Sequence, residues 1–454
     1  MLALGLVIVV SIGLMAVHIV SPRMSWLERI GLSFPIGMGI QTMIMALIDM
    51  CSVPLTSMSM IVSGLVAAVL LAVGCRYKGL CMRRVPRESN TAVSGEYNLV
   101  WLLLVCLIVY FEYMNFSKCM YFPTFDRDSL AGFDTIGYVI AQEHTFGMMS
   151  LFDTLRSPHI HNAGSYITYA PMTQLGYAYV YLLGAETSKL MPALMYLSFI
   201  IAFYGAVCRV TGRTVAAAAT LLMMITPEMI SFSSMSATNC IHAVSASLGV
   251  IYVALWFRGR RQSDLVLGSL LLALNVWTRT DGVVFVIAAL VVGIAAVRQR
   301  RWVWMAIVGC AFIPMIFWGL FCKVSGFYAE GIVIMFPFWD AEKAGAIWRG
   351  IWSLLCNTDR YGVTFLFFLL AMLGNVWFLI RRRDNLPLLA MMVLALALYM
   401  AMLYQIDYKW DTMGNVLAYS AKRFLFCFVP LAWFGAITDR WCVMLSDKIE
   451  KFLS

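Results

Sequence analysis

Residues 98–134 read NLVWLLLVCLIVYFEYMNFSKCMYFPTFDRDSLAGFD, an apolar run followed closely by a cluster of charges. The run 98–116 has the length of a transmembrane helix, because about 20 apolar residues cross the hydrocarbon core of a bilayer. The nine residues 126–134 then carry three aspartates and one arginine. Acids crowded near a membrane repel one another unless a cation or a proton lies among them. This stretch therefore predicts a membrane span that leads into a charged site at the membrane surface.

The rest of the chain has the same apolar character. Of its 454 residues, 62% are hydrophobic and 13% are charged, and its mean hydropathy is +0.82. Ordinary soluble domains carry about 25% charged residues, so this composition excludes them. A membrane β-barrel would show alternating segments of about ten residues, which do not occur here. We predict an all-α polytopic membrane protein with about 13 spans, near 2–20, 30–50, 55–74, 98–116, 190–208, 214–227, 238–257, 264–278, 282–297, 302–322, 361–380, 386–406 and 423–438.

Cysteines, net charge and the first residues exclude several other classes. The 12 cysteines are scattered without a Cys-x-x-Cys pair, so neither a zinc site nor a disulfide framework is indicated. The net charge of +9 comes from short clusters between spans, which are typical of topology signals and not of nucleic-acid binding. Residues 1–20 lack a basic n-region and an Ala-x-Ala-like site, so we interpret them as a retained span.

Basic residues predict which ends of the spans face the cytoplasm. Clusters at 76–87, 258–261, 298–301 and 381–383 all fall on one side, and with smaller groups they place 21 of the 33 Lys and Arg residues inside. Only eight of the 24 acidic residues share that side, which leaves 16 at or beyond the outer face. Thirteen spans then put the N-terminus outside and the C-terminus inside.

Two long segments lie outside in this topology, 117–189 and 323–360. The Tyr-rich stretch 168–184 is short for a span, so we expect a helix at or dipping into the outer surface. The amphipathic stretch 338–355 carries three tryptophans and is expected to be a second juxtamembrane helix. We divide the chain into a three-span extension with a basic loop, 1–97, and a main transmembrane module, 98–454.

The aspartates of the first outer segment are the candidate catalytic residues. In the functional interpretation, one carboxylate accepts a proton from an incoming hydroxyl or amide, with Arg127 or another cation offsetting its charge. The alternative is structural, because Asp is a favoured N-cap and turn residue. We rank Asp128 first, Asp126 second and Asp134 third.

The order of several motifs resembles the GT-C superfamily of integral-membrane glycosyltransferases. That superfamily includes the protein O-mannosyltransferases and the aminoarabinose lipid A transferases. The resemblance covers about residues 98–440 and is carried by the following segments: Asp128 with Phe133, Ala141 to Gly147, Tyr169-Ala170-Pro171-Met172-Thr173-Gln174-Leu175-Gly176-Tyr177, Trp277-Thr278-Arg279-Thr280-Asp281-Gly282, and Lys422-Arg423-Phe424-Leu425 to Pro430. Two departures, a lone proline at Pro171 and three helices before the usual first one, leave the donor sugar open.

The resemblance implies a donor whose sugar or glycan is linked to a polyprenyl phosphate. Such a donor needs cations at the membrane surface, and snorkelling or pairing with a nearby acid is the alternative role for each. Lys422 and Arg423 stand out, because positive charge at an outer span end runs against the topology trend. The candidate phosphate-binding residues are Arg279, Lys422, Arg423, Arg360 and Lys409.

Four further residues are predicted to shape the substrate cleft. Glu112 is an acid near the outer end of a span, where ionisable groups commonly line a cavity. His159, His161 and Tyr166 lie in the first outer segment. A His-x-His pair alone does not make a metal site, while some GT-C members bind a divalent ion at their acidic motif and others need none. No cofactor is therefore assigned, and Mg²⁺ or Mn²⁺ stays an open alternative.

These patterns predict a glycosyltransferase of the bacterial inner membrane that acts on the periplasmic face, with an outer-loop Asp as catalytic base. Its partners would be the polyprenyl-phosphate-linked donor, a protein, lipid or polysaccharide acceptor, and membrane lipids, but no nucleic acid. Two alternatives stay open. A flippase or transporter of lipid-linked glycans would place charges and helix breaks at mid-bilayer depth, and a polysaccharide polymerase or ligase would place its large loop late in the chain.

Overall fold

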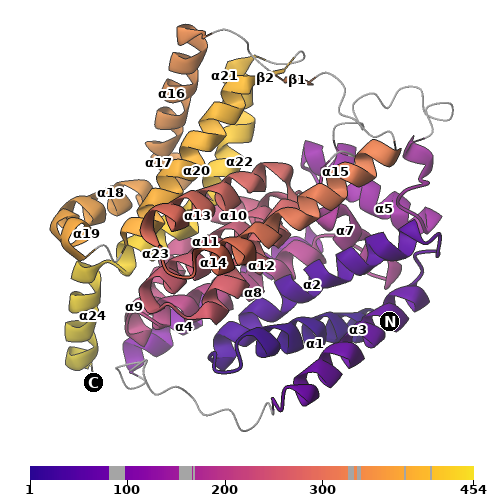
Figure 1. Cartoon of the computed structure of the whole chain (residues 1–454), viewed down its shortest axis with the longest axis horizontal. Coiled ribbons are helices and arrows are strands. Elements are labelled where there is room, and N and C mark those ends of the chain that lie inside the picture. The colour runs from indigo at the N-terminus through magenta and orange to yellow at the C-terminus, as the bar shows by residue number, and fades with distance from the viewer. Residues whose placement is uncertain are drawn as a thin grey trace.

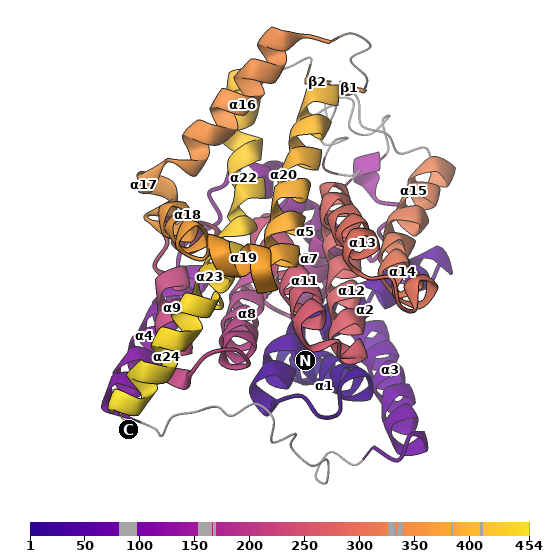
Figure 2. The ribbon, with the colours of Figure 1, turned by 60° about the vertical axis from the view of Figure 1, so that its left-hand side comes forward.

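The computed structural model describes residues 1–80, 98–152, 166, 169–325, 332–334, 339–382, 385–408 and 412–453. This part is helical apart from one short antiparallel pair, β1 (Ile332–Ile334) and β2 (Ile406–Tyr408), in which Ile332 lies opposite Tyr408. Figures 1 and 2 show the helices as one bundle, from which α16 and the neighbouring parts of α20 and α22 project at the upper edge.

Eight helices of the described part are long and apolar enough to cross a membrane, which confirms the polytopic helical class. A ninth candidate is a pair of segments bent by 43°, Met413–Phe426 and Phe428–Ile437. The eight are α1 (Leu2–Val20), α2 (Trp26–Met50), α3 (Ser57–Tyr77), α4 (Leu99–Tyr121), α8 (Leu190–Cys208), α11 (Asn239–Gly259), the joined α14–α15 (Arg301–Val324) and α20 (Leu386–Gln405).

The other predicted spans fall on shorter or broken helices, so the count of 13 is not confirmed. α12 ends after 17 residues, about 26 Å, and α9 ends after 12, before Pro227 begins a separate helix. Asn375 separates two helices within the span predicted at 361–380. These elements are α9 (Arg213–Met224), α10 (Pro227–Phe232), α12 (Gln262–Thr278), η3 (Thr280–Gly282), α13 (Val283–Ala296), α18 (Thr364–Gly374), α19 (Val376–Arg382), α21 (Met413–Val416), η5 (Leu417–Ala421), α22 (Lys422–Phe426) and α23 (Phe428–Ile437).

Polar contacts gather at the two opposite ends of the bundle. At one end, Arg209 pairs with Asp264, Arg258 binds Asn385, and Glu450 on α24 (Arg440–Leu453) accepts from the Thr214 backbone N–H. We call this the arginine-rich end; Arg209 and Arg258 are among the basic residues predicted to lie inside. The opposite end carries Asp128 and is called the Asp128 end. In Figure 2, α24 marks the lower end, and β1 and β2 mark the upper end.

The centre and the rim of the bundle differ in burial, as expected for helices inside a bilayer. All of the apolar window of α11 is buried, against α8, α12, α20 and α23. Only 6% of the corresponding window of α4 is buried. Because α4 keeps a long apolar face exposed, it is placed to contact lipid.

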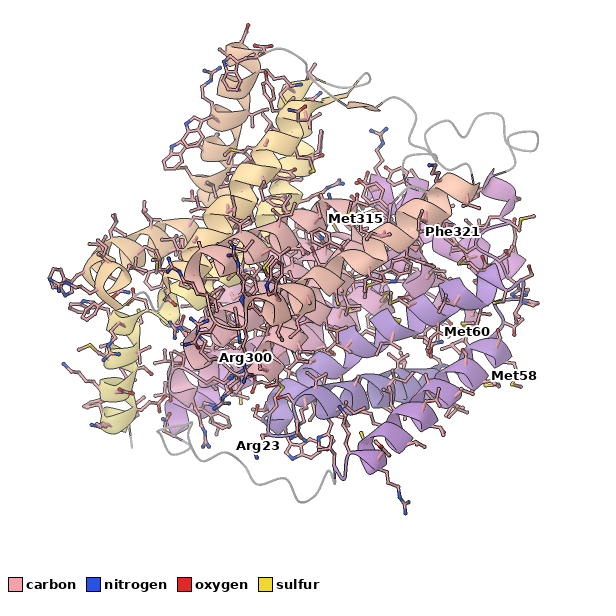
Figure 3. All side chains as sticks on the ribbon, viewed as in Figure 1. Arg23, Met58, Met60, Arg300, Met315 and Phe321 are labelled. Carbon is pink, nitrogen blue, oxygen red and sulfur yellow. The ribbon has the colours of Figure 1, made fainter. Side chains whose placement is uncertain are left out.

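The two helices of the first hairpin, α1 and α2, approach closely at glycines. A methyl group at Gly13 would collide with the backbone carbonyl oxygen of Ser33, and one at Gly37 would collide with that of Val9. Small residues allow helix backbones to pack at such short range in membranes. Figure 3 labels Arg23, in the connection between α1 and α2, and Met58, near the start of α3. Helix α2 also packs against α8 in the main bundle.

Gly13→Ala is expected to destabilise the protein by about 1–3 kcal/mol, because the added methyl must push two backbones apart. The thermal unfolding midpoint of the protein in detergent measures this effect. The matched control is Gly74→Ala on α3, where the added methyl would meet only Ile19 at 3.7 Å. An equal loss of stability in both variants would contradict the close contact.

Both predicted juxtamembrane stretches contain helices. Within 168–184 lies α7 (Met172–Leu182), which is almost wholly buried and packs against α5 (Asp134–Glu143) and α2. Its 11 residues span about 16 Å, too short to cross a bilayer. Within 338–355 lies α16 (Ala341–Leu355), which buries Ile347 and Ile351 next to α20 and leaves Trp348 exposed.

Candidate functional site

Asp128 lies at the centre of a group of charged and aromatic side chains at the Asp128 end. Arg423 Nη1 pairs with Asp128 Oδ2, although the two residues are 295 positions apart in the chain. The Tyr166 hydroxyl donates to Asp128 Oδ1 at 2.8 Å. The side chains of Asp128 and Arg423 keep 16% and 21% exposure. The carboxylate is thus held from both sides and remains reachable.

Asp126 forms the turn that presents Asp128. Its Oδ2 accepts from the backbone N–H and the hydroxyl of Ser129, each at 3.2 Å. The chain then forms a π-helical turn, η1 (Ser129–Phe133), that leads into α5. These contacts are those of a helix-capping aspartate, so the structural alternative describes Asp126 well.

Asp134, the third candidate, ties α5 to its neighbours. Its Oδ1 accepts from the Tyr181 hydroxyl at 2.7 Å, and its Oδ2 accepts from the Thr124 hydroxyl at 3.1 Å. Burial, together with this bond to Asp134, raises the pKa of Tyr181 to about 12, so its phenol stays a donor at neutral pH. Asp134 therefore holds two segments together.

An aromatic wall connects Asp128 with Arg279. Phe133 packs edge-on against Tyr166 and Tyr169, with ring centroids 5.3 Å and 5.2 Å apart. The Arg279 guanidinium lies 5.8 Å from the centroid of the Tyr169 ring, a cation–π distance. Burial raises the pKa of the Tyr166 phenol, and the Asp128 charge raises it further. Tyr166 is consequently a hydrogen-bond donor to Asp128 across the physiological pH range.

The charge of Arg279 is neutralised by its neighbour. Its Nε and Nη2 donate to the two oxygens of Asp281 at 3.0 Å and 2.6 Å. Burial alone would raise the pKa of the Asp281 carboxyl. The adjacent Arg279 guanidinium outweighs this effect and holds the pKa of Asp281 below its usual value. The pair therefore stays ionised and is neutral overall.

Lys422 and Arg360 extend the cationic side of the group. Lys422 directly precedes Arg423, and its ammonium lies 5.9 Å from the centroid of the Phe232 ring. Arg360, on α17 (Thr358–Tyr361), pairs with Glu228 at 2.9 Å. Both partners of that pair act electrostatically on Lys422. Three of the predicted phosphate-binding cations, Arg360, Lys422 and Arg423, thus lie close enough to act on one another electrostatically, and Arg423 also contacts Asp128.

Four predicted site residues remain. His159, His161 and Lys409 lie outside the described residues. Glu112 is buried in α4 and lines a different cavity, which includes Arg209 and Asp264 of the arginine-rich end. Among the described residues, no three His, Cys, Asp or Glu side chains come together as metal ligands, and the metal requirement stays open.

Glu228 and His242 were not among the predicted site residues, and the structure places both next to charged members of this group. Glu228 is the second residue of α10, after Pro227, and pairs with Arg360. His242 Nε2 is buried without a hydrogen-bond partner in the described part and lies 4.0 Å from Asp281. An acid directly after a helix-starting proline was the available signal for Glu228. Nothing in the sequence singled out the contact of His242.

The fold and this group of side chains define a polytopic helical membrane protein with paired charges at one end of its bundle. No known protein family matches the chain, and neither the curated proteins nor the solved structures contain a significant match.

Proposed function

We propose that the protein is a membrane glycosyltransferase that moves a sugar or glycan from a polyprenyl-phosphate-linked donor to an acceptor at the Asp128 end. The observation that carries this proposal is the position of Asp128 between Arg423 and Tyr166, with Lys422 directly before Arg423 in the chain. A proton acceptor and phosphate-binding cations are the two elements that such a transfer needs. We assign this end to the periplasmic face of a bacterial inner membrane.

The chemistry follows from these positions. Asp128 takes the proton of an acceptor hydroxyl or amide as the acceptor atom attacks the anomeric carbon. The bond between that carbon and the phosphate oxygen breaks, and its electron pair leaves with the polyprenyl phosphate. Lys422 and Arg423 stabilise the charge that develops on this leaving group. A guanidinium has five N–H donors, so Arg423 can contact Asp128 and the phosphate together. Backside attack inverts the anomeric centre.

Tyr166 orients the proposed base, and its loss should have a moderate effect. Tyr166→Phe removes the hydrogen bond to Asp128 Oδ1 and keeps the ring that packs on Phe133. A hydrogen bond to a charged group is worth about 1.5–3 kcal/mol, so we expect kcat to fall at least tenfold. The matched control is Tyr138→Phe, an exposed tyrosine on α5. Equal transfer rates in Tyr166→Phe and the wild type would contradict the proposed role of Tyr166 in orienting Asp128.

The direct test is reconstitution of the full chain in liposomes with a panel of polyprenyl-phosphate-linked and polyprenyl-diphosphate-linked sugars. Release of the polyprenyl carrier, measured with and without EDTA, is expected for one donor class. Movement of labelled donor between leaflets without release of its sugar would support the flippase alternative and overturn the proposal. Chain growth on the lipid carrier itself would support a polymerase.

A further inference from the structure

Lys189 is a buried cation that has no role in the proposed sugar transfer. Its side chain is 2% exposed, and the residue lies at the N-cap of α8. Both features cost free energy, because a buried ammonium loses its hydration and the N-terminus of a helix carries a partial positive charge. A lysine in this position therefore needs contacts that offset these costs.

The Lys189 ammonium binds the backbone that leads from α4 to Asp128. Its Nζ donates to the carbonyl oxygen of Phe122 at 2.8 Å and to that of Pro123 at 3.5 Å. We call residues 122–126 the link; they belong to no helix or strand. Because Pro123 has no N–H and the link lacks repeating backbone hydrogen bonds, side chains of neighbouring elements must fix its path.

Thr124 holds the next residue of the link. Its hydroxyl donates to Asp134 Oδ2 at 3.1 Å and lies 3.5 Å from the Ser236 hydroxyl. Ser236 in turn accepts from the hydroxyl of Ser188, the chain neighbour of Lys189, at 3.0 Å. The start of α8 and the start of α5 thus hold the link together. Asp134 also acts electrostatically on the Lys189 ammonium.

We infer that Lys189 is a positioning residue for Asp128: it fixes the link so that the carboxylate meets Arg423 and Tyr166. This inference rests on the proposed function, in which Asp128 is the base. The carbonyl of Pro123 is only five residues before Asp128, so its release shifts the carboxylate without removing a group that touches the donor. A misplacement of about 1 Å can cost about 10²-fold in rate.

Lys189→Met tests this role, because it removes the ammonium and keeps an unbranched side chain. We expect kcat for transfer to fall about 10²-fold, while the Kd for the donor and the number of donor sites per protein stay close to those of the wild type. Expressing kcat per donor site removes the effect of any unfolded protein. The matched control is Lys118→Met, since the half-buried Lys118 also donates to a backbone carbonyl, that of Ile230, outside the link. Its kcat should change less than about threefold.

Hydrogen exchange measured by mass spectrometry tests the same step without a transfer assay. Peptides that cover residues 122–134 should exchange at least about tenfold faster in Lys189→Met than in the wild type, while peptides of α11 keep their protection. A milder variant, Thr124→Val, removes the second tie without changing a charge. It should give the same local change in exchange and lower kcat about tenfold.

Unchanged exchange at 122–134 in both variants, or a kcat of Lys189→Met close to that of the wild type, would overturn the inference. Faster exchange throughout the chain, or loss of donor binding, would make Lys189 a general stabilising residue and would also overturn it. A wild-type protein that transfers no sugar would instead overturn the proposed function. The exchange of residues 122–134 would then still decide whether Lys189 holds the link.

Discussion

Asp128→Asn is expected to lower the rate of sugar transfer about 10³-fold while the protein stays folded, because positioned general bases contribute about 10²–10⁴-fold. Asparagine keeps an oxygen that can accept from Tyr166, but it cannot take a proton from the acceptor. The substitution therefore removes the proposed chemistry with little change in shape. Carrier release from the donor in liposomes measures the rate, and the thermal unfolding midpoint reports the fold.

The matched control is Asp359→Asn, which removes the same charge from an exposed position at the same end of the bundle. Its transfer rate should equal that of the wild type. The other two aspartates separate catalysis from structure. Asp126→Ala and Asp134→Ala remove acceptors that hold Ser129 and Tyr181, so they should reduce stability more than Asp128→Asn does. Full transfer activity in Asp128→Asn would refute its role as the base.

The membrane class and the clustering of charges followed from short stretches of sequence. Apolar runs such as 98–116 specify a span by composition alone, and eight such runs appear as long helices in the part of the chain that the structure describes. Residues at the same end of neighbouring spans are brought together by topology. This is why Asp128 and Arg423 were both candidates although 295 positions separate them. The exact number of spans could not be predicted from the sequence, because helix breaks such as the one at Asn375 depend on how the helices pack.

The roles of the individual site residues could be distinguished only with the structure. Three aspartates in nine residues look alike in sequence, and only the turn capped by Asp126 shows which carboxylate meets Arg423. Glu112 illustrates the opposite case. Its position in a span indicated that it lines a cavity, but which cavity depends on how α4 packs against α8. Helix packing is a long-range property, and a single sequence carries little information about it.

Arg423→Gln is expected to lower kcat/KM for the donor about 10²–10³-fold, the loss typical of removing one preorganised group that stabilises developing charge. Arg423→Lys should recover part of this loss, because lysine keeps the charge but not the planar, bidentate geometry. The control is Arg349→Gln on α16, which removes an exposed cation from the Asp128 end. Steady-state rates over a range of donor concentrations separate KM from kcat.

The pairing of Arg423 with Asp128 leaves two roles to distinguish, a phosphate ligand or only a holder of the base. A double-mutant cycle decides between them, because residues in contact reveal their shared contribution as non-additivity. If Arg423 binds phosphate, Arg423→Gln must still weaken donor binding when Asp128 is already Asn. If it only holds the base, donor affinity in the double variant equals that of Asp128→Asn. The second result would leave Lys422 as the cation next to the leaving group, and the proposed division of roles at this site would be wrong.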